Sequence, residues 1–118
     1  LAFAEVAELD RIYAGMSSVD YSGYPDCRPE YVKAFQRLAS LATKRGVEGN
    51  PVEIRVPLLH MTKADAVRKG LELGVDYSMT QSCYEPDETG RACGKCESCR
   101  LRLEAFREAG ATDPVDYV

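Results

Sequence analysis

Four cysteines near the C-terminal end of this 118-residue sequence have the spacing of a metal site. Cys93, Cys96 and Cys99 are separated by two residues each, and Cys83 lies nine residues before the first of them. Thiolates two residues apart can turn back on one another and present both sulfurs to one ion. Gly94, directly after Cys93, is free to take the positive φ that such a turn needs. The pattern predicts a tetrahedral four-cysteine zinc site, structural because it leaves no open coordination position.

Two other uses of these cysteines stay open at this stage. Disulfides are disfavoured by the odd count of five cysteines and by the lack of a secretory signal pattern. An iron–sulfur cluster is the second alternative, because the C-x-x-C-x-x-C run begins like a ferredoxin ligand run, although the final C-x3-C-P is missing. Cys27 stands apart and is not expected to be a ligand, since free cysteines often pack as small apolar residues.

A second group of chemically useful side chains follows a short apolar run at 11–16 that predicts a buried strand. The segment 17–29, SSVDYSGYPDCRP, is punctuated by Ser, Gly and Pro and is predicted to be a loop. Its functional side chains are those of Asp20, Tyr21, Tyr24, Asp26, Cys27 and Arg28. A loop at the carboxyl end of a parallel strand is where α/β proteins place ligands. We therefore predict a binding site in this loop.

Alternating predicted elements must position these residues. Apolar spacing predicts helices at 1–9, 30–45, 63–73 and 99–108, and short strands at 11–16, 52–56 and 75–79. Strands that alternate with helices predict an α/β fold with a parallel sheet. By role, the sequence divides into an α/β part at 1–79 and a zinc-binding segment with the terminal helix at 80–118.

The predicted helices have recognisable ends and one clear apolar face. In the helix at 30–45, the residues spaced for one face are Tyr31, Ala34, Phe35, Leu38, Leu41 and Ala42. Gly46 is the predicted C-cap of this helix. Thr62 and Asp65 have the spacing of a capping box at the start of the predicted helix at 63–73. Ser98 is the predicted cap of the helix at 99–108.

Two further polar residues have competing interpretations. Lys63 lies just inside a helix start, where the helix dipole disfavours a cation, so a ligand-facing role and a solvated lysine are both consistent with its position. His60 is the only histidine and is interpreted as a structural loop residue, because the sequence names no partner for it.

Composition narrows the class of protein. The net charge is −4, so no basic surface for nonspecific nucleic-acid binding is expected. No apolar run approaches the length of a membrane span. Reduced cysteines suited to a metal, without a signal sequence, point to the cytoplasm.

Several motifs together resemble the C-terminal half of one family. They are DYSGYPDCRPEY (20–31), PLLHMTK (57–63), GLELGVDYS (70–78), SCY (82–84), ACGKCESC (92–99) and EAGATDP (108–114). In this order they resemble the 7-cyano-7-deazaguanine synthase (QueC) family of queuosine biosynthesis, over about residues 11–118. The loop SGYPDCR combined with the cysteine pattern makes the resemblance specific.

The resemblance implies an ATP-dependent carbon–nitrogen ligase that converts 7-carboxy-7-deazaguanine and ammonia to the nitrile. It implies a Rossmann-like parallel sheet of the adenine nucleotide α-hydrolase, or PP-loop, type. It also implies zinc on Cys83, Cys93, Cys96 and Cys99, with ATP and Mg²⁺ for the intact enzyme, and a homodimer.

One feature of the family is missing. The Ser-Gly-Gly-x-Asp-Ser loop that cradles ATP phosphates does not occur in this sequence. The chain also begins as if inside an element, without an initiator methionine. We therefore expect a partial domain that is inactive alone.

The remaining residues suit the substrate side of the reaction. Arg28 and Lys63 are the candidates for the anionic groups, and so for catalysis. Asp20 and Asp26 could accept hydrogen bonds from the deazaguanine edge or help to hold Mg²⁺, and Tyr24 could stack on the ring. Cys27, in the same loop, is a weaker candidate for a nucleophile, because no base for it is visible.

Two rival functions follow from the same sequence. The first is a related ATP pyrophosphatase that modifies tRNA, which the acidic charge balance disfavours. The second is a small zinc-binding interaction module without catalytic activity, which would not need the two β/α units or the loop at 17–29.

Overall fold

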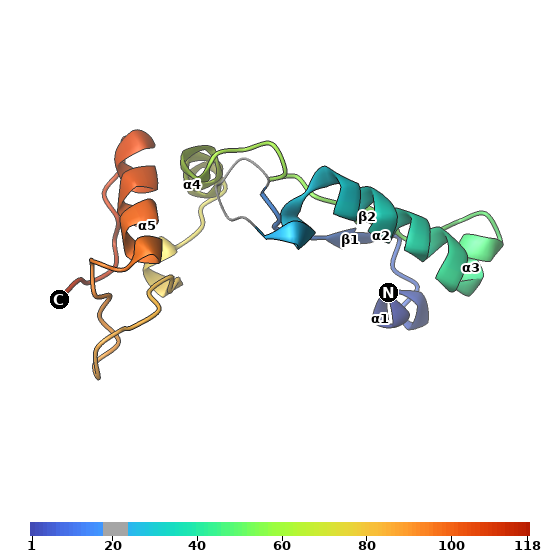
Figure 1. Cartoon of the computed structure of the whole chain (residues 1–118), viewed down its shortest axis with the longest axis horizontal. Coiled ribbons are helices and arrows are strands. Elements are labelled where there is room, and N and C mark those ends of the chain that lie inside the picture. The colour runs from blue at the N-terminus through green and yellow to red at the C-terminus, as the bar shows by residue number, and fades with distance from the viewer. Residues whose placement is uncertain (18–23) are drawn as a thin grey trace. The chain divides into compact units, whose positions relative to one another are not determined.

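The computed structural model describes residues 1–17 and 24–118 (Figure 1). In chain order the helices and strands are α1 (Ala2–Val6), β1 (Arg11–Tyr13), η1 (Pro25–Cys27), α2 (Pro29–Ala42), α3 (Lys44–Val47), β2 (Glu53–Arg55), α4 (Lys63–Glu72), η2 (Tyr77–Met79) and α5 (Glu97–Glu108), where η marks a 3₁₀ helix. No helix in the described part of the chain has the length and apolar character of a membrane span.

The chain forms two compact units, Leu1–Met61 and Thr62–Val118. The first holds the two strands with α2, and the second holds α4 packed against α5. Helix α4 therefore groups with the cysteines by packing. The division at residue 79 that the sequence analysis drew by role stays a prediction.

The first unit is built on a parallel pair of strands, as the alternation of elements predicted. β1 and β2 pair with Ile12 opposite Ile54. Val52 and Ile54 are buried, with 0% and 8% of their surface exposed. Burial of these branched side chains holds the short strand pair against α2.

Helix α2 closes the outer edge of β2 with a single side chain. The Gln36 amide nitrogen donates to the Val52 carbonyl at 3.0 Å, and its amide oxygen accepts from the Ile54 N–H at 2.8 Å. These backbone groups face away from β1, whose bonds to β2 use the alternate residues, such as the N–H of Glu53. Gln36 thus occupies the place of a neighbouring strand, and the sheet is two-stranded over the described residues.

The apolar face predicted for α2 is not the side of the helix that packs on this sheet. Tyr31, Leu38 and Leu41 remain 40%, 48% and 66% exposed. The packed side instead carries Ala39, which is fully buried, and Gln36. A small residue and a strand-pairing amide allow a closer approach to β2 than the large side chains would.

The predicted helix at 30–45 is in fact two helices, because Thr43 interrupts it. The Thr43 hydroxyl donates to the Ala39 carbonyl at 2.8 Å and accepts from the Gly46 N–H at 3.0 Å, so it ends α2 and caps α3. Gly46 is therefore part of α3, and its prediction as a C-cap was wrong. Gly74 and Gly110 follow the ends of α4 and α5 with φ of 75° and 73°.

Replacing Gly46 with alanine is expected to destabilise the chain by about 1–3 kcal/mol, the usual cost of overpacking. A Cβ at this position would lie 2.5 Å from the carbonyl oxygens of Ala39 and Ser40, which are backbone atoms that cannot rotate away. Urea unfolding followed by circular dichroism measures the change. Gly15→Ala is the matched control, because a Cβ there meets nothing within 4 Å. Equal midpoints for the two variants would contradict the close approach.

The second unit confirms one predicted cap and corrects two other predictions. Thr62 and Asp65 form the expected capping box of α4. Residues 75–79 are not a strand: η2 turns there so that the Tyr77 ring packs edge-on against Phe106, with the centroids 5.2 Å apart. Helix α5 begins at Glu97 and is capped by Cys96, so Ser98 lies inside it instead of capping it.

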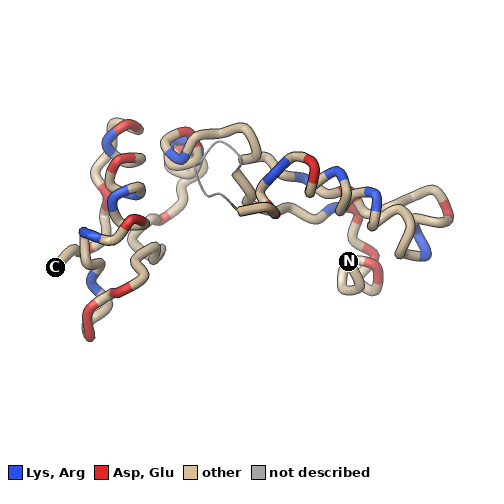
Figure 2. Tube along the Cα trace, in the orientation of Figure 1, with Lys and Arg blue, Asp and Glu red and all other residues tan. Residues whose placement is uncertain are grey.

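Acidic and basic residues are interspersed along most of the trace, α5 included (Figure 2). This mixture agrees with the net charge of −4. No basic tract of the kind that binds nucleic acid nonspecifically stands out in the part of the chain that the structure describes.

Candidate metal centre

The four predicted cysteines lie together. The sulfurs of Cys83, Cys93, Cys96 and Cys99 all lie within 4.8 Å of one another, and those of Cys93 and Cys99 are 4.0 Å apart. Zinc–sulfur bonds of about 2.3 Å in a tetrahedron separate the sulfurs by about 3.8 Å. No disulfide joins any of the five cysteines in this structure. The donor set and spacing fit one ion such as zinc.

Local backbone turns bring these sulfurs together. Gly94 takes a φ of 68° directly after Cys93, as predicted, and the chain then enters α5 with Cys96 as its cap. The Cys83 sulfur accepts hydrogen bonds from the N–H groups of Cys93, at 3.2 Å, and Glu85, at 3.3 Å. The first of these hydrogen bonds joins the Cys83 loop to the loop that begins at Cys93.

The thiols differ in acidity. The backbone N–H groups of Lys95 and Cys96 lower the pKa of Cys93. Those of Tyr84 and Cys99 lower the pKa of Cys96 to about 6. Burial raises the pKa of the Cys99 thiol to about 12. A metal ion must displace the Cys99 proton, so its affinity depends on pH.

A buried ion pair, which was not predicted from the sequence, lies beside the thiols. The Arg102 guanidinium contacts the Asp113 carboxylate through Nε at 2.6 Å and Nη2 at 2.8 Å, and the two side chains are only 7% and 2% exposed. The Tyr117 hydroxyl donates to the same carboxylate at 2.6 Å. One signal was available: Arg102 lies at helical spacing between the buried residues Cys99 and Phe106, where a solvated arginine does not belong.

The contacts of this ion pair shift the pKa values of Asp113, Arg102 and Tyr117. Burial alone would raise the pKa of Asp113, but the hydrogen bonds from Arg102 and Tyr117 outweigh it and lower that pKa. The hydrogen bond to Asp113 raises the pKa of Arg102. Burial, followed by the hydrogen bond to Asp113, raises the pKa of Tyr117.

Acid is expected to destabilise the metal-free chain through Asp113. Its carboxyl has a lower pKa in the folded chain than the value of about 3.9 in an unfolded one. The stability it contributes is therefore complete above about pH 4 to 5 and is lost as the pH falls through the folded pKa. Urea unfolding with a chelator, at pH 7, 4 and 3, measures this. The variant Arg102→Met/Asp113→Leu should lose less stability over this range, and an identical loss would contradict the assignment.

The candidate substrate residues lie in the first unit, apart from Lys63. Tyr24 and Asp26 are exposed, and Arg28 donates through Nε to the Pro25 carbonyl at 3.1 Å at the start of α2. The turn of η1 thus brings these three side chains onto one short segment. Asp20 lies outside the described residues.

The other two candidate residues belong to different units. Lys63 is the first residue of α4 and belongs to the second unit. Cys27, the suggested nucleophile, is a half-buried free thiol at the end of η1. Their catalytic roles stay predictions.

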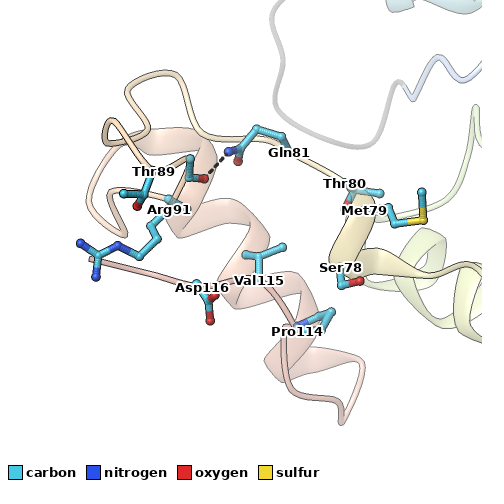
Figure 3. Close-up of a pocket in the computed structure, with 11 residues that line it drawn as sticks. Ser78, Met79, Thr80, Gln81, Thr89, Arg91, Pro114, Val115 and Asp116 are labelled. Carbon is cyan, nitrogen blue, oxygen red and sulfur yellow. Dashed lines mark hydrogen bonds between the residues drawn. The ribbon is translucent and has the colours of Figure 1, made fainter.

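A cavity of about 300 Å³ lies among the loops of the second unit (Figure 3). It is lined by residues 78–81, 89–92 and 114–116. Gln81 spans its wall by donating to the Gly90 carbonyl at 3.0 Å, while the Arg91 guanidinium is held by Asp87. The cavity contains no substrate candidate among the described residues, and its walls are the loops that support the thiols.

Comparison with known proteins gives the family. A model described as queuosine biosynthesis protein QueC matches residues 1–110. The chain is 60% identical over 118 residues to the 7-cyano-7-deazaguanine synthase of Acinetobacter baylyi, covering 100% of this chain and 52% of that protein. The synthases of Kineococcus radiotolerans, 60% identical, and Citrifermentans bemidjiense, 57% identical, match 99% of this chain and 51% and 52% of their own lengths.

The chain therefore spans about half the length of the curated relatives it matches. The match extends across both compact units, so the strands, the η1 segment and the four thiols are all inside it. It confirms the resemblance found in the sequence motifs. The chain belongs to the queuosine biosynthesis protein QueC family.

Proposed function

We propose that this chain is the C-terminal half of a 7-cyano-7-deazaguanine synthase. The observation that carries the proposal is the identity of 57–60% across the whole chain to curated proteins with that name. The close set of four thiols supports it, because the sequence resemblance implied a metal on these cysteines.

The proposed reaction converts 7-carboxy-7-deazaguanine and ammonia to a nitrile at the expense of ATP. The carboxylate carbon loses its three bonds to the two oxygens and gains three bonds to nitrogen, so its oxidation level does not change and no redox partner is needed. The oxygens must leave from activated forms, which is the role of ATP. In this proposal the ATP loop and the bound Mg²⁺ belong to the N-terminal half of the intact enzyme.

This chain would supply the substrate side of the site. The Arg28 guanidinium and the Lys63 ammonium neutralise the carboxylate and phosphate charge that develops during activation. Tyr24 stacks on the deazaguanine ring, and Asp20 and Asp26 accept hydrogen bonds from its polar edge. The exposure of Tyr24 and Asp26 leaves both side chains available for a ligand.

The zinc of the proposed enzyme is structural. Four thiolates complete its coordination and leave no position for substrate or water. Bound zinc would hold the loop before Cys83 to the start of α5 and take no part in the chemistry.

The two strands are proposed to belong to a larger Rossmann-like parallel sheet. Short parallel pairs are rarely stable alone, because parallel sheets are normally covered on both faces. Gln36 occupies the outer edge of β2, so the sheet can extend only beyond β1. The intact enzyme is further proposed to be a cytoplasmic homodimer, in keeping with its family resemblance.

A chimaera tests the proposed function. The chain is joined to the N-terminal half of one of its curated relatives and given 7-carboxy-7-deazaguanine, ATP and ¹⁵N-ammonia. We expect a nitrile product with one ¹⁵N atom, detected by mass spectrometry, and none from the 118-residue chain alone. Arg28→Met and Lys63→Met should each reduce turnover by about 10²-fold or more, as loss of a charge-stabilising donor does.

The controls separate this function from its rivals. Arg107→Met changes an exposed residue of α5 and should leave turnover unchanged. A folded, zinc-loaded chimaera that makes no nitrile would contradict the proposal. ATP consumption only with added tRNA would favour the tRNA-modifying alternative.

A further inference from the structure

We infer that the buried network of Arg102, Asp113 and Tyr117 positions the four cysteines for metal binding. The inference rests on the proposed zinc site and assigns it a supporting set of residues outside the cysteine motif. The network joins the three chain segments that carry the ligands, and each connection is a specific set of hydrogen bonds.

The first connection is to the segment before Cys83. Arg102 Nη1 donates to the Thr80 hydroxyl at 2.8 Å, to the Thr80 carbonyl at 3.3 Å and to the Ser82 hydroxyl at 3.4 Å. Its Nη2 donates to the Tyr77 carbonyl at 3.1 Å. Cys83 is the ligand farthest from the others in sequence, so its position depends on the loop that Arg102 holds.

The second connection is through α5 itself. Arg102 lies three residues after Cys99, on the same face of this helix. Its guanidinium carbon lies 5.3 Å from the centroid of the Phe106 ring, which fixes the side chain between the ring and the loop. The helix that begins at the thiols therefore also carries the side chain that holds the Cys83 loop.

The third connection is to the C-terminal tail. The Asp113 carboxylate accepts hydrogen bonds from Arg102 and from the Tyr117 hydroxyl, and these bonds fix the tail. The tail pairs in turn with Ala92, whose N–H donates to the Asp116 carbonyl at 2.8 Å and whose carbonyl accepts from the Val118 N–H at 3.0 Å. Ala92 directly precedes the second ligand of the set.

The network therefore holds the thiols near one another without a metal having to gather them. An ion that binds a preorganised site does not have to order the loops, and residues that orient ligands from outside the coordination sphere support affinity in this way. A pair with a role in stability alone would contribute to folding but would not change the zinc affinity of the folded chain.

The test measures zinc dissociation constants on the full chain, by competition with a chromophoric chelator. Arg102→Met/Asp113→Leu removes both charges together and leaves neither buried without a partner. We expect it to bind zinc about 10–100-fold more weakly, the range found for outer-shell partners. Tyr117→Phe removes one hydrogen bond without changing shape and should weaken binding about 2–10-fold.

The matched control is Glu104→Gln/Arg107→Met, which removes an exposed ion pair from the same helix and should leave the affinity unchanged. The visible spectrum of bound Co²⁺ reports whether all four thiolates still coordinate. Affinities equal to the control for both test variants would overturn the inference, even if their urea midpoints fell.

Two other outcomes are also decisive. If the double variant does not fold with zinc present, Tyr117→Phe decides, and an unchanged constant for it would overturn the inference. A wild-type chain that binds no zinc would overturn both this inference and the proposed zinc site.

Discussion

Replacing Cys99 with serine is expected to reduce the zinc bound by the chain from about one ion to nearly none. Cys99 is the most buried of the four thiols, with 1% of its surface exposed, and lies in the first turn of α5. A hydroxyl is a poor replacement for a thiolate on zinc and would be buried where a charged sulfur is needed. Metal analysis of the purified chain measures the result.

The same change should destabilise the second unit. Structural zinc contributes on the order of 10 kcal/mol to folding in small zinc domains, which is comparable to the whole stability of a domain. Loss of the ion is therefore expected to lower the urea midpoint of the α4–α5 core around Phe106. Urea unfolding followed by circular dichroism, with and without a chelator, measures this loss.

Cys27→Ser is the matched control, because Cys27 is a free thiol in the other unit. It should retain about one zinc per chain. Full zinc content in Cys99→Ser, or bound iron in place of zinc in the wild type, would contradict the four-thiolate zinc site.

Replacing Arg102 alone with methionine is expected to cost about 3–5 kcal/mol, because the Asp113 carboxylate would be left buried without its cation. The same change removes the donors to Thr80, Ser82 and the Tyr77 carbonyl. Urea unfolding at pH 7 with saturating zinc measures the loss.

The double variant Arg102→Met/Asp113→Leu is expected to recover much of this loss. Apolar residues of similar volume can replace a buried ion pair at little cost to stability, whereas one unpaired charge cannot be tolerated. Arg107→Met breaks an exposed pair on the same helix and should change stability by less than about 1 kcal/mol. If Arg102→Met is as stable as the double variant, Asp113 has found another partner and the expected cost is contradicted.

Local patterns predicted the features that depend on neighbouring residues. The cysteine spacing with Gly94 located the thiol cluster, because the turn and the helix start that gather most of the ligands are encoded within a few residues. The Thr62–Asp65 capping box was predictable for the same reason, since its two partners are three residues apart.

Features that depend on distant packing were not predictable in this way. Residues 75–79 have the composition of a short strand, but Tyr77 contributes more by packing on Phe106, a contact 29 residues away in sequence. Thr43 divides a periodic apolar stretch because its hydroxyl bonds to both helices. The partner of Arg102 could not be chosen from sequence, because several acidic residues lie near it and only the fold of the tail selects Asp113.

The amide of Gln36 also limits how copies of this chain can associate. Exposed strand edges recruit strands from other molecules, and a chain with two open edges can add copies at both ends and grow into a fibre. With the β2 edge occupied, a copy that pairs through β1 has no second edge to offer, so growth stops at a pair. Gln36→Ala is therefore expected to form larger aggregates than the wild type by sedimentation velocity, and equal size distributions would contradict this role.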